Sequence, residues 1–288
     1  MYLEHFSLQR LPFALSPDPS FRVELPGFED ALAIVRRALD DGEGFLEVVG
    51  PVGAGKTMLC RELLASLGES YATAYVADPE LTPRELLVEL MREFGLARLS
   101  RATTAELRHA LLDFALAQWE GGRGVALLID EAQAMPAPTL ESLRLLSNVE
   151  PGSRKLMQIA LFGQPELDAR LAQPGLRQLR QRFTTCIALE PLRRDEVGWY
   201  VDHRLLAAGV WSPDLFSSGA RALLARSSRG VPRLVNVLAH KALIAAYAAG
   251  AQQVTRRHMA LAVADTADAR RGPAQALRRM FVRRLREA

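Results

Sequence analysis

One short segment constrains the fold of this chain more than any other. An apolar run over residues 45–49 leads directly into a glycine-rich loop, and helical periodicity follows from Met58 to Leu67. The loop reads Gly50-Pro51-Val52-Gly53-Ala54-Gly55-Lys56-Thr57. It fills every fixed position of the pattern G-x-x-x-x-G-K-[ST], which joins a strand to a helix around a phosphate chain. Because both flanking elements are present, the segment predicts a nucleoside triphosphate site rather than an ordinary glycine-rich turn.

Each residue type in this loop has a physical task. The glycines let backbone N–H groups curl around phosphates, and Lys56 can reach the β- and γ-phosphates. Thr57 offers a hydroxyl to Mg²⁺, while the following helix directs the positive end of its dipole at the anion. We therefore expect ATP and Mg²⁺ as ligands. The residues expected to bind the nucleotide are Gly50, Pro51, Val52, Gly53, Ala54, Gly55, Lys56, Thr57 and Met58.

A second apolar run supplies the carboxylates that such a site needs. Residues 125–129 are apolar and are followed at once by Asp130 and Glu131. Ligands bind at the carboxyl ends of the strands in an open α/β sheet, where these two residues would lie. We expect Asp130 to hold the magnesium together with Thr57, and Glu131 to orient and deprotonate an attacking water. An acidic turn after a buried strand is the alternative, but the phosphate loop upstream favours a hydrolase.

The rest of the chain alternates strand-like and helical segments as far as residue 190. Cap-like sequences begin helices at Thr82 and Thr103, and Gly121-Gly122 ends the second of them. The strands are expected at Phe45–Val49, Ala72–Ala77, Val125–Ile129, Leu156–Phe162 and Phe183–Leu189. Helices alone are expected afterwards, at Arg193–Ala208, Pro213–Ser227, Pro232–Ala249 and Thr255–Ala267. The predicted fold is α/β, with a five-stranded, mostly parallel sheet covered by helices on both faces, followed by a small all-α domain.

Charge distribution, apolar runs and cysteine usage indicate the cellular compartment and the surfaces that the chain can bind. It holds 36 basic and 33 acidic residues, but residues 270–288 contain seven arginines and one glutamate, which leaves 29 and 32 elsewhere. The body is therefore slightly acidic and the basic character is concentrated in a tail. No secretory signal and no apolar window of about 20 residues is present. The five histidines lack ligand spacing. Cys60 and Cys186 are expected to be small buried side chains in a reducing compartment.

Several further motifs, in the order in which they occur along the chain, resemble those of the AAA+ ATPases. More narrowly, they resemble the general secretion pathway protein A (ExeA-like) group, which includes the MSHA pilus biogenesis proteins (MshM). Besides the two nucleotide motifs, the resemblance covers the N-terminal Tyr2, Phe6, Leu8, Pro12-Phe13 and Pro17-Asp18-Pro19. It also covers Leu161-Phe162-Gly163-Gln164-Pro165-Glu166-Leu167, Leu179-Arg180-Gln181-Arg182-Phe183, Pro191-Leu192 and Arg229-Gly230-Val231-Pro232-Arg233-Leu234-Val235-Asn236.

The resemblance implies roles for further residues. Gln164 matches the sensor-1 position at the end of the fourth strand, where an amide can contact the γ-phosphate or align water. Arg233 matches sensor 2 at the start of a lid helix. Arg182, with Arg180 as the alternative, matches the arginine finger that acts on a neighbour's ATP. The implied boundaries are an N-terminal segment 1–27 that helps close the nucleotide pocket, a core 28–190, a helical lid 191–268 and a basic tail 269–288.

The function implied by the resemblance is that of an assembly ATPase. A cytoplasmic homo-oligomeric, hexamer-like ring would act on pilus or secretion proteins at the inner membrane, in MSHA-type type IV pilus biogenesis or type II secretion. Longer members add a membrane span and a peptidoglycan-binding domain, so a chain ending at 288 favours the pilus type. Within the tail, residues 275–288 place Leu277 and Phe281 opposite Arg278 and Arg279, as in a basic amphipathic helix suited to an anionic membrane surface.

Two other functions remain open. Related AAA+ proteins regulate DNA transposition or replication, and the arginine tail could grip phosphates of DNA. The acidic body and the lack of an interleaved aromatic and basic patch weigh against DNA. A nucleotide-dependent binding switch with negligible turnover is the third possibility, and Glu131 weighs against it. A solvated tail without a ligand is the alternative to a membrane-binding one.

Overall fold

The computed structural model describes residues 2–15, 18–96, 102–147, 155–210 and 214–270. The described chain forms two compact units. One contains residues 26–190, and the other combines residues 1–25 with residues from 191 onward. The predicted amphipathic helix at 275–288 lies outside the described residues.

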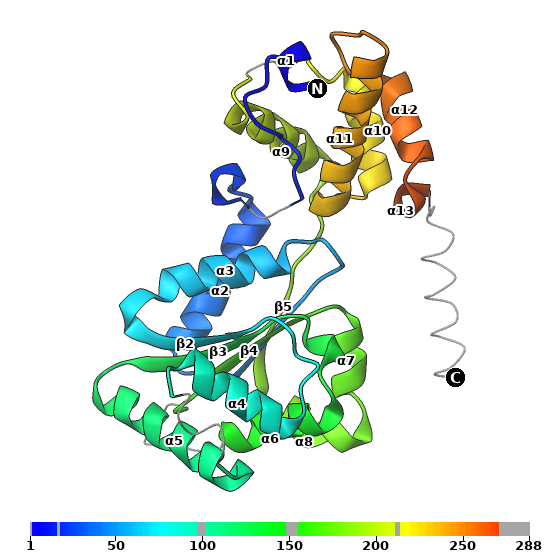
Figure 1. The fold of residues 1–288 in the computed structure, drawn as a ribbon. Coiled ribbons are helices and arrows are strands. Elements are labelled where there is room, and N and C mark those ends of the chain that lie inside the picture. The colour runs from blue at the N-terminus through cyan, green and yellow to red at the C-terminus, as the bar shows by residue number, and fades with distance from the viewer. Residues whose placement is uncertain (1, 16–17, 97–101, 148–154, 211–213, 271–288) are drawn as a thin grey trace. The chain divides into compact units, whose positions relative to one another are not determined.

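A parallel sheet forms the centre of the unit spanning residues 26–190 (Figure 1). Its strands are β1 (Phe45–Val49), β2 (Tyr71–Val76), β3 (Gly124–Ile129), β4 (Gln158–Gly163) and β5 (Phe183–Ala188). Their order is β2-β3-β4-β1-β5, and every pairing is parallel. The register aligns Val49 with Gly163 and Ile129 with Leu161, so the three central strands end at the same edge. The predicted five-stranded parallel sheet is confirmed.

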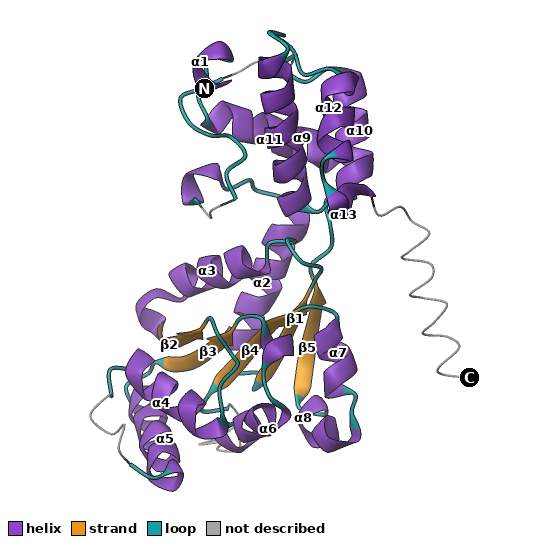
Figure 2. Cartoon of the chain, turned by 45° about the vertical axis from the view of Figure 1, so that its right-hand side comes forward, coloured by secondary structure: helices purple, strands orange, loops and turns teal. Residues whose placement is uncertain are grey.

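Helices cover both faces of this sheet, as Figure 2 shows. On one face lie α2 (Pro26–Asp40) and α3 (Lys56–Leu67), which pack on alternate strand residues such as Leu46, Val48 and Leu128. The remaining helices pack on the opposite face against residues such as Phe45 and Leu127. They are α4 (Pro83–Glu93), α5 (Thr104–Glu120), α6 (Ala137–Leu146), α7 (Glu166–Leu171) and α8 (Arg177–Arg180). Burial on both faces explains why the central strand β3 is apolar from Val125 to Ile129 instead of alternating with polar residues.

The capping residues seen in the sequence begin their helices as predicted. The Thr82 hydroxyl accepts a hydrogen bond from the Glu85 backbone N–H at 3.3 Å, and the Glu85 carboxylate accepts one from the Thr82 N–H at 2.8 Å. Thr103 and Glu106 form the same reciprocal pair. Each pair satisfies two N–H groups that a helix start leaves without partners, which is why α4 and α5 begin where they do.

The other unit is helical. It contains α1 (Tyr2–His5), α9 (Arg194–Ala207), α10 (Ser218–Ser228), α11 (Pro232–Ala248), α12 (Arg256–Ala264) and α13 (Ala267–Arg270). The predicted helix at Pro213–Ser227 is wrong at its start, because Leu215 to Ser217 form an extended segment that pairs with Val254 before Ser217 caps α10. The helix predicted at Thr255–Ala267 is also shorter, since α12 ends at Ala264. Among the described helices, none combines the length and apolar composition needed to cross a bilayer.

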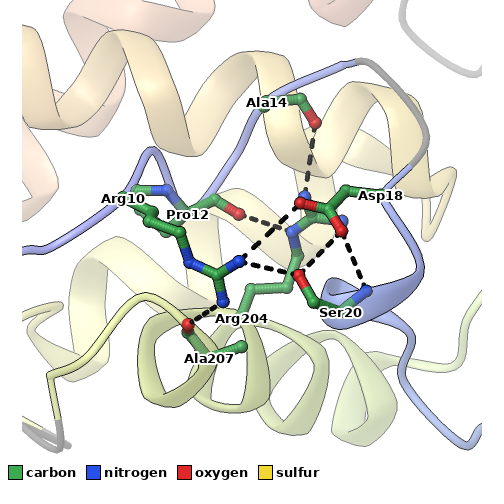
Figure 3. Close-up of polar contacts among 7 residues, drawn as sticks. All are labelled: Arg10, Pro12, Ala14, Asp18, Ser20, Arg204 and Ala207. Atoms are coloured by element: carbon green, nitrogen blue, oxygen red, sulfur yellow. Dashed lines mark hydrogen bonds and ion pairs between the residues drawn. The ribbon is translucent and has the colours of Figure 1, made fainter.

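The N-terminal segment packs within this helical unit (Figure 3). Arg204 of α9 is buried and donates hydrogen bonds to the carbonyls of Pro12 at 2.5 Å and Ala14 at 3.3 Å. Arg10 reaches the Ala207 carbonyl at 2.7 Å, and the Tyr2 hydroxyl lies 2.9 Å from Nδ1 of His240 on α11. Segment 1–25 is thus tied to α9 and α11. Its contribution to a nucleotide pocket stays a prediction.

One glycine explains part of the motif at residues 229–236. Gly230 has a left-handed φ of 75°, and a Cβ there would lie 1.9 Å from the Leu192 carbonyl oxygen. The Leu192 N–H also donates to the Gly230 carbonyl at 2.8 Å. Only glycine satisfies both the backbone conformation and the close approach.

The expectation that both cysteines are buried is wrong for one of them. Cys60 on α3 is buried, but Cys186 on β5 is exposed. β5 is one of the two edge strands, and its Thr184, Cys186 and Ala188 are exposed on alternate positions. An edge strand is covered less completely than a central one, which an apolar sequence run does not reveal.

Candidate nucleotide-binding site

The phosphate loop has the backbone geometry that an anion cradle requires. It connects β1 to α3, with Gly53 and Gly55 in left-handed conformations at φ of 81° and 106°. A Cβ on Gly50 would lie 2.8 Å from the Leu189 carbonyl oxygen, so no larger residue fits there. The loop's N–H groups and the start of a twelve-residue helix lie together at the carboxyl end of the sheet.

Lys56 is a buried cation at the centre of this loop. Its side chain donates to the carbonyls of Gly50 at 2.9 Å and Pro51 at 3.1 Å, and the residue is 4% exposed. No carboxylate lies within ion-pairing distance of it in the described part of the chain. Burial lowers the pKa of Lys56 below its usual value, although the charges of Glu131, Asp130 and Glu166 act in the opposite direction. A buried ammonium held only by carbonyls would gain strongly from an anion.

Thr57 and Asp130 meet although 73 positions separate them in sequence. The Thr57 hydroxyl donates to Oδ2 of Asp130 at 2.6 Å, and Oδ1 of Asp130 accepts from the Glu131 N–H at 2.9 Å. Asp130 is 3% exposed. A hydroxyl and a carboxylate at the foot of a phosphate loop are oxygen ligands of the kind that Mg²⁺ takes.

Glu131 has an uncommon backbone conformation for a residue with a side chain. Its φ of 49° and ψ of 34° are left-handed, which costs a residue other than glycine about 1–2 kcal/mol. Its carboxylate Oε2 accepts from Nε2 of Gln133 at 2.5 Å and from Nε2 of Gln164 at 3.1 Å. Burial raises the pKa of Glu131, but these two bonds and the charge of Lys56 outweigh it and leave the pKa below its usual value. Glu131 is therefore ionised at neutral pH.

Gln133 and Arg170 belong to the site but were missed by the sequence reasoning. Gln133 lies in a short 3-10 turn (Ala132–Ala134), and its Oε1 accepts from the Gln164 backbone N–H at 2.9 Å. Arg170 of α7 donates to the carbonyls of Gln133 and Met135. Gln133 stands two residues after Glu131 in a motif already singled out, but its partner is 31 positions further on, so no local pattern indicates the contact.

The structure places the remaining four candidate residues in four different settings. Gln164 follows β4, which lies between β1 and β3, and it contacts Glu131 directly. Arg180 ends α8 and is exposed. Its positive charge acts to lower the pKa of Glu47 and of Cys186, against the effect of burial. Arg182 is half-buried just before β5, and its positive charge, after the effect of burial, lowers the pKa of Lys155. Arg233 is exposed at the second residue of α11, in the helical unit. Their roles toward nucleotide stay predictions.

The residues present fit both expected ligands. The positive φ at Gly53 and Gly55, the close approach at Gly50 and the buried Lys56 suit a polyphosphate. Thr57 and Asp130 suit Mg²⁺, and Glu131 beyond them supplies an ionised carboxylate. The arrangement can therefore hold a nucleoside triphosphate and activate a water molecule beside it.

Comparisons with known proteins identify a family and a relative for this chain. A family model described as an AAA domain matches residues 36–171. General secretion pathway protein A of Aeromonas hydrophila is 40% identical over 270 residues, covering 94% of this chain and 49% of that protein. The chain thus spans about half the length of this relative.

Solved structures share the fold at low identity. The ORC2 protein of Aeropyrum pernix, solved in ADPNP–ADP complexes, has a TM-score of 0.64 at 18% identity, covering 89% of this chain and 72% of that one. Cdc6p of Pyrobaculum aerophilum has a TM-score of 0.67 at 16% identity, with coverage of 88% and 70%. The Holliday junction branch migration motor RuvB of Thermotoga maritima has a TM-score of 0.53 at 18% identity, with coverage of 82% and 66%. These likenesses concern the fold alone.

The fold, the phosphate loop and the matched domain define the class: this chain is an AAA-domain protein. The class implies nucleotide binding. More narrowly, the chain is a homologue of general secretion pathway protein A.

Proposed function

We propose that this protein binds ATP with Mg²⁺ and hydrolyses it to ADP and phosphate. The observation that carries the proposal is the meeting of Lys56, Thr57, Asp130 and Glu131 at one edge of the sheet. A phosphate loop alone would suit a binding protein. An ionised Glu131 beside the magnesium ligands favours hydrolysis, because water attack requires a group that orients the water and takes its proton.

The roles of the residues follow from their chemistry. Residues from Gly50 to Met58 surround the phosphates, and Lys56 exchanges its two carbonyl partners for phosphate oxygens. Thr57 and Asp130 hold Mg²⁺, which neutralises charge on the phosphates when it is bound. Glu131 takes the proton of the attacking water, and Gln164 contacts the γ-phosphate or that water. Arg233 senses the nucleotide from the lid, and Arg182 or Arg180 completes the site of a neighbouring subunit.

Two variants separate binding from hydrolysis. Lys56→Ala removes the buried ammonium and is expected to abolish tight nucleotide binding. Glu131→Gln keeps the shape of the side chain and should retain ATP binding while lowering the hydrolysis rate by about 10²–10⁴-fold. Binding of a fluorescent ATP analogue and release of phosphate measure the two effects. Equal hydrolysis by wild type and Glu131→Gln would contradict the role of Glu131.

The cellular role that we propose is that of an assembly ATPase in type II secretion or MSHA-type type IV pilus biogenesis. The homology to general secretion pathway protein A supports the secretion-related role. In this proposal the protein forms a hexamer-like cytoplasmic ring that acts on assembly proteins at the inner membrane, and the arginine-rich tail from residue 270 onward contacts the membrane surface.

The same arginine tail favours one alternative, an ATPase that regulates DNA transposition or replication. Seven arginines within residues 270–288 could neutralise DNA phosphates, and such binding would weaken steeply with added salt. Binding to DNA and to anionic lipid vesicles, each measured from 50 to 300 mM salt, distinguishes the two proposals. Tight DNA binding at physiological salt, without vesicle binding, would favour the alternative.

A further inference from the structure

Three side chains beside the phosphate loop form a closed hydrogen-bonded set. Gln133 donates from Nε2 to Oε2 of Glu131 at 2.5 Å and accepts at Oε1 from the Gln164 N–H at 2.9 Å. Gln164 in turn donates from its own Nε2 to the same Oε2 of Glu131 at 3.1 Å. Both ends of the Gln133 amide are therefore used, and their roles are fixed by the partner groups, one an acceptor and one a donor.

The backbone of Gln133 is held as firmly as its side chain. Arg170 donates to the carbonyls of Gln133 and Met135, which anchors the short turn after Glu131 to α7. A Cβ on Gly163 would lie 3.3 Å from Oε1 of Gln133 and 2.7 Å from a Leu167 methyl carbon, so glycine at the end of β4 leaves room for the amide. A glutamine has several rotatable bonds, and this packing selects one conformation for it.

The side-chain amides of Gln133 and Gln164 bind one carboxylate oxygen of Glu131 and leave the other to accept a proton from water. Both donate to Oε2, and within the described ranges no hydrogen bond reaches Oε1. A carboxylate whose Oε2 is fixed by two donors directs Oε1 in a defined direction. Such alignment is what a base needs to meet a water molecule in reactive geometry.

The two glutamines differ in the other acceptors available to them. Gln164 lies at the end of β4, between the strand of the phosphate loop and the strand of the carboxylates, where a bound γ-phosphate would compete for its amide. The side-chain amide of Gln133 donates to Glu131, and its oxygen accepts from the backbone N–H of Gln164. Hence the Gln133 bond to Glu131 would remain if Gln164 turned to a bound nucleotide.

We propose that Gln133 is a positioning residue that keeps the Glu131 carboxylate aligned during turnover, while Gln164 exchanges between Glu131 and bound nucleotide. This inference deepens the proposed ATPase function and rests on it. In this role Gln133 acts through Glu131 and does not contact the reacting atoms.

Isosteric substitutions at Gln133 test the proposal. Gln133→Met removes both hydrogen bonds and retains the size of the side chain. Gln133→Glu retains an acceptor for the Gln164 N–H but replaces the donor toward Glu131 with a second carboxylate. Both variants should lower kcat by roughly 10–100-fold, as expected for one lost hydrogen bond to a charged group, with the affinity for an ATP analogue changed less than about threefold. Gln252→Met, on an exposed loop of the helical unit, is the matched control and should retain wild-type turnover.

A double-mutant cycle separates positioning from general structural support. If Gln133 acts only through Glu131, Gln133→Met should cost less than about threefold in the Glu131→Gln background, measured by single-turnover hydrolysis. A structural role would cost the same in both backgrounds and would lower the melting temperature and the affinity for nucleotide together.

The outcomes distinguish this proposal from the one on which it rests. A wild-type protein that binds ATP without hydrolysing it would overturn the ATPase function. An active wild type with either Gln133 variant within twofold of its kcat would overturn the positioning role and leave the ATPase function intact. Equal losses in the two backgrounds of the cycle would also overturn it.

Discussion

Glu47 is a buried carboxyl group away from the candidate site. It lies on β1, is 3% exposed, and accepts a hydrogen bond from the Cys186 thiol at 3.6 Å. Its other oxygen, Oε1, has no hydrogen-bond partner in the part of the chain that the structure describes. Burial, with a smaller effect from the charge of Asp168, raises the pKa of Glu47 to about 7, although Cys186 and Arg180 act in the opposite direction. The folded state therefore favours the protonated form.

This raised pKa predicts a stability that falls as the pH rises. Between the unfolded pKa of about 4.5 and the folded pKa of about 7 the folded state holds more protons, so the free energy of unfolding decreases across this window and levels off above it. Glu47→Gln removes the ionisation and should be more stable than wild type by on the order of 2–3 kcal/mol at pH 8, with a difference near zero at pH 4, below both pKa values. Urea unfolding at both pH values measures this. Glu120→Gln, exposed at the end of α5, is the control, and a pH-independent gain at Glu47 would refute the explanation.

At the scale of elements, α9 and the N-terminal segment depend on one buried guanidinium. Arg204 is 6% exposed and donates to the carbonyls of Pro12 and Ala14, as Figure 3 shows. It also donates to the Tyr200 hydroxyl and lies 5.0 Å from the centroid of the Phe21 ring. Arg10 lies 4.7 Å from the same centroid, but its side chain is 49% exposed. The two arginines near the Phe21 ring thus differ in burial, and the buried Arg204 should contribute more to the free energy of unfolding than Arg10.

We expect Arg204→Met to release the N-terminal segment. The carbonyls of Pro12 and Ala14 would lose their donor, so the free energy of unfolding of the helical unit should fall by about 2–4 kcal/mol. Hydrogen exchange should rise at the Gln9 amide, which donates to the Ala208 carbonyl at 2.8 Å. Arg10→Met should cost less than about 1 kcal/mol, since exposed pairs contribute little. Unchanged exchange at Gln9 in Arg204→Met would show that other contacts hold the segment.

At the scale of the whole molecule, the proposed finger requires a second copy of the chain. If Arg182 completes a neighbour's site, turnover per subunit should rise with protein concentration, and Arg182→Ala should lose about 10³–10⁵ in rate with little loss of ATP affinity. Mixing Arg182→Ala subunits with Lys56→Ala subunits should restore part of the hydrolysis. Arg180→Ala is tested in a separate mixture, because Arg180 lies near Glu47 whereas Arg182 lies near Lys155. No recovery in either mixture, with turnover independent of concentration, would exclude a finger in trans.

The sequence by itself determined the features that depend on neighbouring residues. The phosphate loop, the apolar strand before Asp130, and the capping pairs at Thr82 and Thr103 are local patterns, because hydrogen bonds over a few residues and the periodicity of burial create them. The start of α10 is not a local pattern, because the pairing of Leu215 and Ser217 with Val254 places the first helical residue at Ser218.

Only the tertiary structure decided how distant segments meet. The insertion of β4 between β1 and β3 brings Gln164 to Glu131 and allows Gln133 to bridge them, while the edge position of β5 exposes Cys186. The attachment of the N-terminal segment to α9 likewise joins residues about 190 positions apart. These contacts depend on strand order and on packing between elements. Which distant segments come into contact depends on the free energy of the whole fold, and no short stretch of sequence determines that free energy.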